Sequence, residues 1–166
     1  ASVAKKIDEI LKLDEMADTT SKAELSDHTI VFEHVTFSYG EGQPVLKDVS
    51  FTVPDGKVTA LVGVSGSGKS TAASLICRFW DITEGQICLG GVPLNQIPLS
   101  DLMSQISFVT QNTFLFKKSI RDNIMMGNPE ATEEEMMQAA KDAVCHDFIM
   151  RLPKGYDTVI DKETKL

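Results

Sequence analysis

The segment that most constrains this chain is a small-residue loop at residues 63–70 (GVSGSGKS), which fits the pattern G-x-x-x-x-G-K-[ST] at every fixed position. An apolar run at residues 58–62 (VTALV) precedes it and predicts a strand covered on both faces. A helix is expected next, over residues 69–80. Glycines let backbone N–H groups converge on phosphate oxygens, and a helix start adds further donors. An ordinary glycine-rich turn is the alternative, but the strand–loop–helix context favours a phosphate-binding loop.

Two side chains of the loop carry the expected chemistry. We expect Lys69 to reach the β- and γ-phosphates of a nucleotide and the Ser70 hydroxyl to coordinate Mg²⁺. The 166 residues include 16 Lys plus Arg and 24 Asp plus Glu, a formal charge of −8. This balance argues against nucleic acid as a partner, because phosphate backbones attract clustered basic residues. A nucleotide needs only a few local donors, so it remains compatible with an acidic chain.

Apolar periodicity predicts the other elements. Period-two alternation or short apolar runs predict strands at residues 35–39, 49–53, 86–92 and 106–110. Ser100 and Asp101 are expected to cap a short helix. Beyond residue 111 the pattern becomes helical, and Thr132 with Glu135 forms a capping box.

The N-terminal residues are predicted to form a helix and a linker that precede the main domain. Residues 1–16 have the spacing of an amphipathic helix, and residues 17–28 are polar and aperiodic, as in a linker. A domain over residues 29–166 follows, with a boundary expected between residues 112 and 113. No signal peptide is visible, and the absence of an initiator Met suggests a piece of a longer protein. The three cysteines show no C-x-x-C spacing and fit a reducing compartment.

Three further segments, together with the loop, resemble one family. They are FSYG at residues 37–40, VLKDVSFTVPDGKVTALVG at residues 45–63 and SFVTQNTFLF at residues 107–116. The chain resembles the nucleotide-binding domain of an ABC transporter, and residues 117–129 and 152–158 resemble the start of the helical subdomain in exporter-type members. The resemblance implies an α/β fold: a P-loop NTPase core with an antiparallel β subdomain and the start of an α-helical subdomain, truncated at its C-terminal side.

The resemblance also implies a set of site residues. Tyr39 matches the aromatic residue that stacks on adenine, and stacking by itself makes no use of its hydroxyl. Gln111 matches the Q-loop glutamine, a catalytic-site residue that senses the γ-phosphate and shares the Mg²⁺ with Ser70. Phosphate contacts are expected from the main chain or side chains of Ser65, Gly66, Ser67, Gly68, Lys69, Ser70 and Thr71.

The implied function is the ATP-binding segment of an ABC exporter. A second nucleotide-binding domain would complete a dimer, and a transmembrane domain would hold it at the cytoplasmic face of a membrane. The signature LSGGQ segment, the catalytic glutamate and the switch histidine are not found and are expected beyond Leu166. We therefore expect ATP hydrolysis in the parent protein and an inactive 166-residue chain. The alternatives are a non-hydrolysing nucleotide-binding fragment and a soluble ABC-type ATPase without a transport role.

Overall fold

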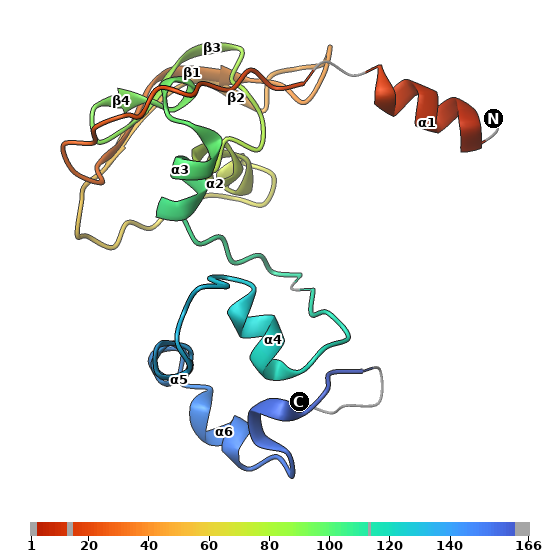
Figure 1. The fold of residues 1–166 in the computed structure, drawn as a ribbon. Coiled ribbons are helices and arrows are strands. Elements are labelled where there is room, and N and C mark those ends of the chain that lie inside the picture. The colour runs from red at the N-terminus through yellow and green to blue at the C-terminus, as the bar shows by residue number, and fades with distance from the viewer. Residues whose placement is uncertain (1–2, 13–14, 113, 162–166) are drawn as a thin grey trace. The chain divides into compact units, whose positions relative to one another are not determined.

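The computed structural model describes residues 3–12, 15–112 and 114–161 and divides the chain into two compact units. The first unit ends at Phe108, the second begins at Val109, and each is described by itself (Figure 1). Within the described ranges, no helix combines the length and the hydropathy needed to cross a bilayer.

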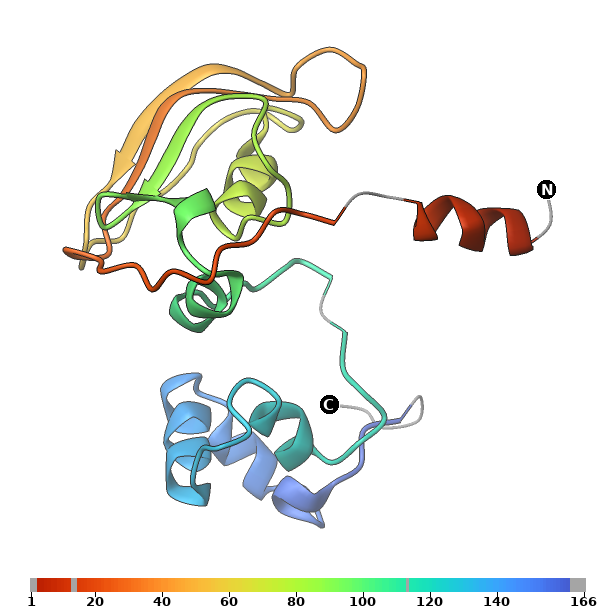
Figure 2. The same cartoon turned by 45° about the horizontal axis from the view of Figure 1, so that its top comes forward.

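The first unit is built on a four-stranded sheet in the order β2-β1-β3-β4, with every neighbouring pair antiparallel. The main strands lie side by side and curve around a helix (Figure 2). Val35 and Phe37 are buried and His34 is exposed, as the predicted alternation requires. The strand ends at Phe37, however, and Tyr39, which is predicted on the same face, is exposed. The strands are β1 (Ile30–Phe37), β2 (Leu46–Val53), β3 (Glu84–Leu89) and β4 (Val92–Pro93).

A double β-bulge bends the middle of this sheet. His34 and Asp48 both have positive φ angles, of 52° and 51°, and His34 Nδ1 lies 2.7 Å from Asp48 Oδ1. The register of β1 against β3 shifts at the same place. Gly85 faces this bulge with φ 86°, and a Cβ there would lie 2.3 Å from the His34 carbonyl oxygen. Only glycine fits where the two backbones approach so closely.

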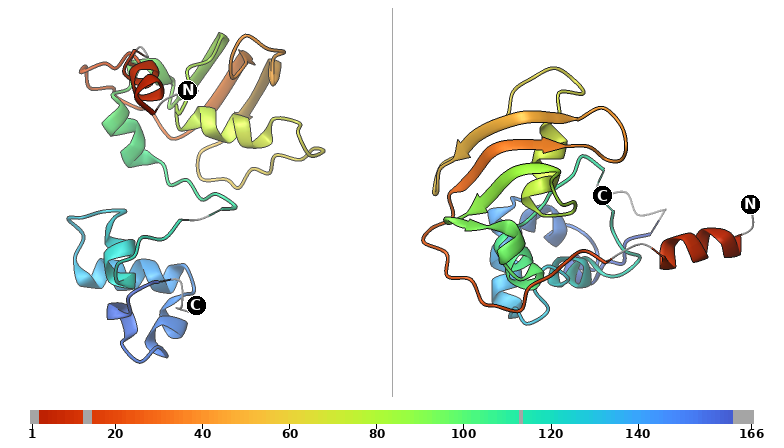
Figure 3. Two further views of the ribbon diagram at one scale, coloured as in Figure 1. Left: turned by 90° about the vertical axis from the view of Figure 1, so that its right-hand side faces the viewer. Right: turned by 90° about the horizontal axis from the view of Figure 1, so that it is seen from above.

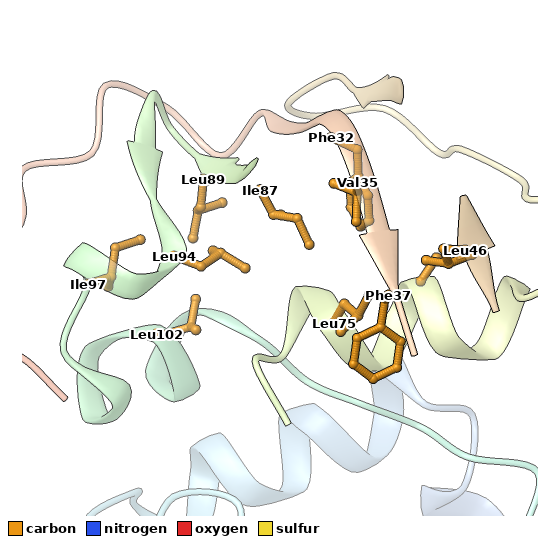
Figure 4. Close-up of a cluster of buried hydrophobic side chains, with 11 residues drawn as sticks. Phe32, Val35, Phe37, Leu46, Leu75, Ile87, Leu89, Leu94, Ile97 and Leu102 are labelled. Atoms are coloured by element: carbon orange, nitrogen blue, oxygen red, sulfur yellow. The ribbon is translucent and has the colours of Figure 1, made fainter. Parts of the chain in front are cut away.

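Two helices cover one face of the sheet: α2 (Lys69–Ile76) and α3 (Leu99–Gln105) (Figure 3). Leu75 of α2 lies beside Phe37 of β1, and Leu102 of α3 points toward Leu94, so the hydrophobic core lies between sheet and helices (Figure 4). Leu94 of the 3₁₀ helix η1 (Leu94–Gln96) adds to it. Burial of each such side chain contributes about 1.5–3 kcal/mol. This core fixes α2, and with it the loop before α2, against the sheet.

Two predicted strands are wrong in this structure. Residues 58–62 and 106–110 are irregular, and Val58, Val62 and Val109 are strongly exposed. A strand that is apolar on both faces needs hydrogen-bonded neighbours in the same sheet. No described segment pairs with either run, so neither becomes a strand despite its composition.

The expected linker, residues 17–28, belongs to the first unit and packs against its hydrophobic core. Ala23 and Leu25 contact the hydrophobic core. Asp18 Oδ1 accepts a hydrogen bond from Leu99 N at 3.0 Å and so caps α3. The predicted cap by Ser100 and Asp101 is wrong, because both residues lie inside that helix.

Two predicted helices are shorter than expected. The helix after the loop ends at Ile76 instead of residue 80, because Arg78 adopts a left-handed backbone with φ 50°. The N-terminal helix α1 covers Val3–Leu11, and residues 15–16 are not helical. Its Val3, Ile7 and Leu11 side chains are exposed. Isolated helices of this length are marginal in water.

The second unit is helical, with α4 (Ile120–Met125), α5 (Glu133–Asp142), α6 (His146–Met150) and a 3₁₀ helix η2 (Gly155–Asp157). Its core contains Ile120, Met136, Ala140, Ile149 and Tyr156. The predicted Thr132–Glu135 capping box begins α5 and is confirmed. A second box, Ser119 with Asp122, begins α4.

Candidate functional site

The loop at residues 63–68 leads directly into α2 and turns tightly on itself. Ser67 N donates to the Val64 carbonyl oxygen at 3.2 Å. Gly68 precedes the helix with φ 87°, and a Cβ at this position would lie 2.5 Å from Leu46 Cδ2 and 3.2 Å from the Val45 carbonyl oxygen. Both the backbone angle and the contact with β2 exclude a side chain at Gly68. The glycine before the lysine is therefore required by geometry.

The N-terminus of α2 is open to an anion. Its first intrahelical hydrogen bond runs from Ala72 N to the Gly68 carbonyl oxygen at 2.8 Å, and among the described residues no side chain caps it. The backbone N–H groups of Lys69, Ser70 and Thr71 have no carbonyl partner four residues earlier. Together with the positive end of the helix dipole they form an anion-binding end.

Lys69 places its positive charge over the same loop. Its Nζ donates to the carbonyl oxygens of Gly63 at 2.9 Å and Val64 at 2.8 Å, and to Ser67 Oγ at 3.3 Å. All three acceptors are neutral, and no carboxylate in the described part of the chain forms an ion pair with Lys69. The ammonium charge is therefore not neutralised and is available to a phosphate group.

The hydroxyl groups of the loop are accessible. Ser65, Ser67 and Ser70 are exposed, and Ser70 stands one residue after Lys69 in the first turn of α2. The described residues contain no cluster of His, Cys, Asp or Glu side chains that could hold a metal ion. A single hydroxyl fits Mg²⁺ only as one ligand among phosphate oxygens and waters, which suits a metal that arrives with a nucleotide.

Tyr39 lies beside this loop although the two are far apart in the sequence. Its hydroxyl is 3.1 Å from Thr71 Oγ1, in the first turn of α2. Its ring also makes edge-to-face contacts with Phe37, at 4.9 Å between centroids, and with Trp80, at 5.3 Å. About half of the side chain, 52%, stays exposed and can stack on a ligand. Sequence reasoning missed Phe37 and Trp80 as neighbours of the site, because nothing in their spacing reports a contact with Tyr39.

Gln111 belongs to the second unit, in a bend where its side chain is exposed. Its expected role at the γ-phosphate and Mg²⁺ remains a prediction. In contrast, Tyr39 and residues 63–71 all belong to the first unit, and the Tyr39–Thr71 bond joins them.

Comparison with known proteins decides the family. The family model described as ABC transporter matches residues 46–164, most of the chain. The chain belongs to the ABC transporter family. Its α/β fold with an antiparallel sheet is the fold of the ABC nucleotide-binding domain, so the predicted family and fold class are confirmed. Membership implies that the domain binds a nucleotide.

Two of its relatives are proteins with both ATP-binding and permease parts. A Staphylococcus aureus (strain NCTC 8325) protein named for multidrug export is 44% identical over 82% of this ABC transporter chain. The mycobactin import ATP-binding/permease protein IrtA of Mycobacterium tuberculosis is 45% identical over 83% of the chain. The matched regions are 24% and 16% of these relatives, so the chain corresponds to a minor part of their length.

A solved structure supports the same assignment. The structure of a bacterial Atm1-family ABC exporter with ATP bound has a TM-score of 0.87 and 36% sequence identity. The match covers 95% of this ABC transporter chain and 28% of that one.

Proposed function

We propose that these residues form the Mg·ATP-binding segment of an ABC-type membrane transporter. The observation that carries the proposal is the Lys69 ammonium with only neutral partners, next to the uncapped N-terminus of α2. Loop N–H groups and Lys69 would bind the phosphates, and the Tyr39 ring would stack on the adenine. Mg²⁺ would be held by Ser70, with Gln111 as a second contact, and would neutralise charge on the phosphates.

Nucleotide binding can be tested by calorimetry on the complete polypeptide that contains this chain. The site is built for phosphate groups, so affinity is expected to fall from ATP to ADP and to drop sharply for AMP. Each phosphate removed takes charge-assisted hydrogen bonds with it, worth about 1.5–3 kcal/mol apiece. AMP binding as tight as ATP binding would contradict the assignment of the loop.

Hydrolysis is proposed for the complete protein and not for these 166 residues. Phosphoryl transfer requires a phosphate clamp, a metal ion and a group that orients the attacking water. Lys69 and Ser70 supply the clamp and part of the metal site, whereas the neutral Gln111 amide is a poor base. Loss of general-base and electrostatic contributions lowers rates by about 10² to 10⁴ each. Phosphate release that tracks the 166-residue chain through purification and disappears in Lys69→Ala would refute this.

The complete protein is proposed to act as a dimer of nucleotide-binding domains attached to a transmembrane domain, at the cytoplasmic face of a membrane. Support comes from relatives named as ATP-binding/permease proteins. ATPase activity is then expected to depend on protein concentration or on the dimeric state, which sedimentation measured alongside turnover would check.

Export is the proposed direction, because the S. aureus relative and the Atm1-family structure are both named as exporters. Uptake is a second candidate, because IrtA is equally similar and is named for import. Transport assays in vesicles of both orientations, with ATP supplied on one side, separate the two candidates.

A further inference from the structure

Arg78, just beyond the C-terminal end of α2, is a buried charge on a strained backbone. Its side chain is only 3% exposed, and its φ angle of 50° lies in the left-handed region. A residue other than glycine stays in this region only where its surroundings hold it there, and such strain gathers at ligand-binding and switch segments. Arg78 is therefore a candidate functional position.

The Arg78 guanidinium is only partly satisfied. Its Nε donates to Asp81 Oδ1 at 2.9 Å, and its Nη2 donates to the main-chain carbonyl oxygen of Ala17 at 2.5 Å. Nη1 is buried and has no hydrogen-bond partner among the described residues. A buried donor without an acceptor is unfavourable. The guanidinium thus binds one neutral carbonyl oxygen already and has a donor left for another.

Arg78 also lines a cavity of about 450 Å³ in the first unit. This volume lies within the range of small-molecule sites, about 300–1,000 Å³. Three lining residues belong to the buried core, where Figure 4 shows them: Leu75, Ile87 and Leu94. Exposed amide side chains line the cavity as well: Gln86, Asn95 and Gln96. An apolar lining with a few polar groups is typical of a site for a small organic ligand.

The cavity is distinct from the nucleotide site. Neither Tyr39 nor any of residues 63–71 lines it. Trp80 is a neighbour of both, since it lines the cavity and its ring contacts that of Tyr39. A ligand in the cavity would therefore bind without occupying the phosphate loop.

The charges around the cavity favour an uncharged ligand. Asp81 and Glu84 line it together with Arg78, so two carboxylates face one guanidinium. A ligand carboxylate would meet like charge there, which is costly at close range. A cation would leave the free Arg78 donor without an acceptor. A neutral carbonyl oxygen satisfies that donor and adds no charge.

We propose that this cavity binds a small uncharged amide whose carbonyl oxygen accepts a hydrogen bond from Arg78. A branched apolar group of the ligand packs against Leu75, Ile87 and Leu94. The side-chain amides of Asn95 and Gln96 supply further donors and acceptors. This site is additional to the proposed nucleotide-binding function and does not depend on it.

Ligand-observed NMR on the complete polypeptide tests the site with N-acetyl-leucinamide, a neutral probe with two carbonyl groups and a branched side chain. For a molecule of this size we expect a Kd on the order of a millimolar. N-acetylglycinamide lacks the apolar branch, and N-acetylleucine carries a carboxylate. Both are expected to bind roughly tenfold more weakly, the first through lost apolar burial and the second through like charge.

Two variants assign the binding to the cavity. Arg78→Gln removes the guanidinium and is expected to weaken probe binding roughly tenfold. Ala17→Phe adds a bulky side chain to the lining and keeps the main-chain carbonyl that Arg78 binds, so it is expected to weaken binding by a similar factor. It keeps the test decisive if Arg78→Gln folds poorly. The matched control is Ala139→Phe, at an exposed position of α5 in the second unit.

Several results would overturn the proposal. They are no binding of N-acetyl-leucinamide up to about 10 mM, equal binding of N-acetylleucine or N-acetylglycinamide, and wild-type affinity in a folded Arg78→Gln or Ala17→Phe variant. Lys69→Ala is expected to bind the probe as the wild type does, and a loss there would place the probe in the phosphate site instead. Failure of ATP binding with intact probe binding would refute the nucleotide function alone.

Discussion

Lys69 Nζ donates a hydrogen bond to the carbonyl oxygen of Gly63, six residues earlier, at a distance of 2.9 Å. The Lys69 side chain thus folds back over residues 63–68, the loop that leads into its own helix. Because its acceptors are neutral oxygens, these bonds lack the attraction between opposite charges that a phosphate oxygen would add. A nucleotide can replace these contacts without breaking an ion pair.

Lys69→Ala is therefore expected to abolish tight Mg·ATP binding. Removal of one partner of a charge-assisted contact in a partly desolvated site costs about 2–5 kcal/mol, which is on the order of 30-fold or more in Kd. Calorimetry on the complete polypeptide measures this, with the exposed Lys141 changed to Ala as the control. Wild-type affinity in Lys69→Ala would remove Lys69 from the site.

Ser70→Ala is expected to weaken nucleotide binding mainly when Mg²⁺ is present. The hydroxyl acts through the metal, so its loss costs about 1–2 kcal/mol, roughly tenfold in Kd, only in the metal-bound complex. Titrations of ATP with Mg²⁺ and with a chelator separate the two cases. Equal losses under both conditions would mean that Ser70 contacts the phosphates directly.

Gly68→Ala is expected to destabilise the first unit and disrupt the phosphate site. A left-handed backbone costs about 1–2 kcal/mol for a residue with a side chain, and the new Cβ would also collide with Leu46 Cδ2, 2.5 Å away. Gly40→Ala is the matched control, because a Cβ there meets no atom within 4 Å. Thermal unfolding and ATP titration of both variants test this, and equal behaviour of the two would contradict it.

The collision and the backbone strain at Gly68 can be separated. Leu46→Ala removes the Cδ2 atom that the new Cβ would meet, so it is expected to relieve part of the Gly68→Ala defect when the two changes are combined. The left-handed angle of 87° remains, so recovery should be incomplete. Full recovery of ATP binding would assign the whole defect to the side-chain contact.

The capping box of α5 predicts a pH dependence of stability. The Thr132 backbone N–H, with a smaller contribution from the Thr132 side chain, holds the pKa of Glu135 below its ordinary value of 4.5. A depressed pKa in the folded state stabilises the protein above pH 4.5, and this stabilisation is lost as the pH falls through the folded-state value.

Thr132→Ala should cost about 1 kcal/mol of helix stability through the lost cap.

Denaturant midpoints measured across the acidic range test this dependence. Glu135→Gln keeps an acceptor oxygen but cannot titrate, so its midpoint is expected to fall less below pH 4.5 than that of the wild type. Glu134→Gln, in the same first turn but outside the box, serves as the control for general charge effects. Identical pH profiles for wild type and Glu135→Gln would show that the box carries no titration-linked stability.

Local signals in the sequence predicted much of this molecule. The tight turn before α2, the start of α2 at Lys69 and the Thr132–Glu135 box each depend on residues within a few positions of one another. The Ser119–Asp122 box has the same kind of signal, a serine followed three residues later by a carboxylate, and could have been found in the same way. Such features are readable because backbone angles and caps are decided by near neighbours.

Tertiary structure alone decided the features that join distant segments. Asp18 caps α3 from 81 residues away, in place of the adjacent Ser100, because docking of residues 17–28 brings its carboxylate to Leu99. Tyr39 bonds Thr71 across 32 residues, and no periodicity records that contact. Conversely, residues 58–62 have the composition of a buried strand but remain irregular, because a strand obtains its hydrogen bonds only from neighbouring strands. Composition determines what a segment can form, and its partners in space determine what it does form.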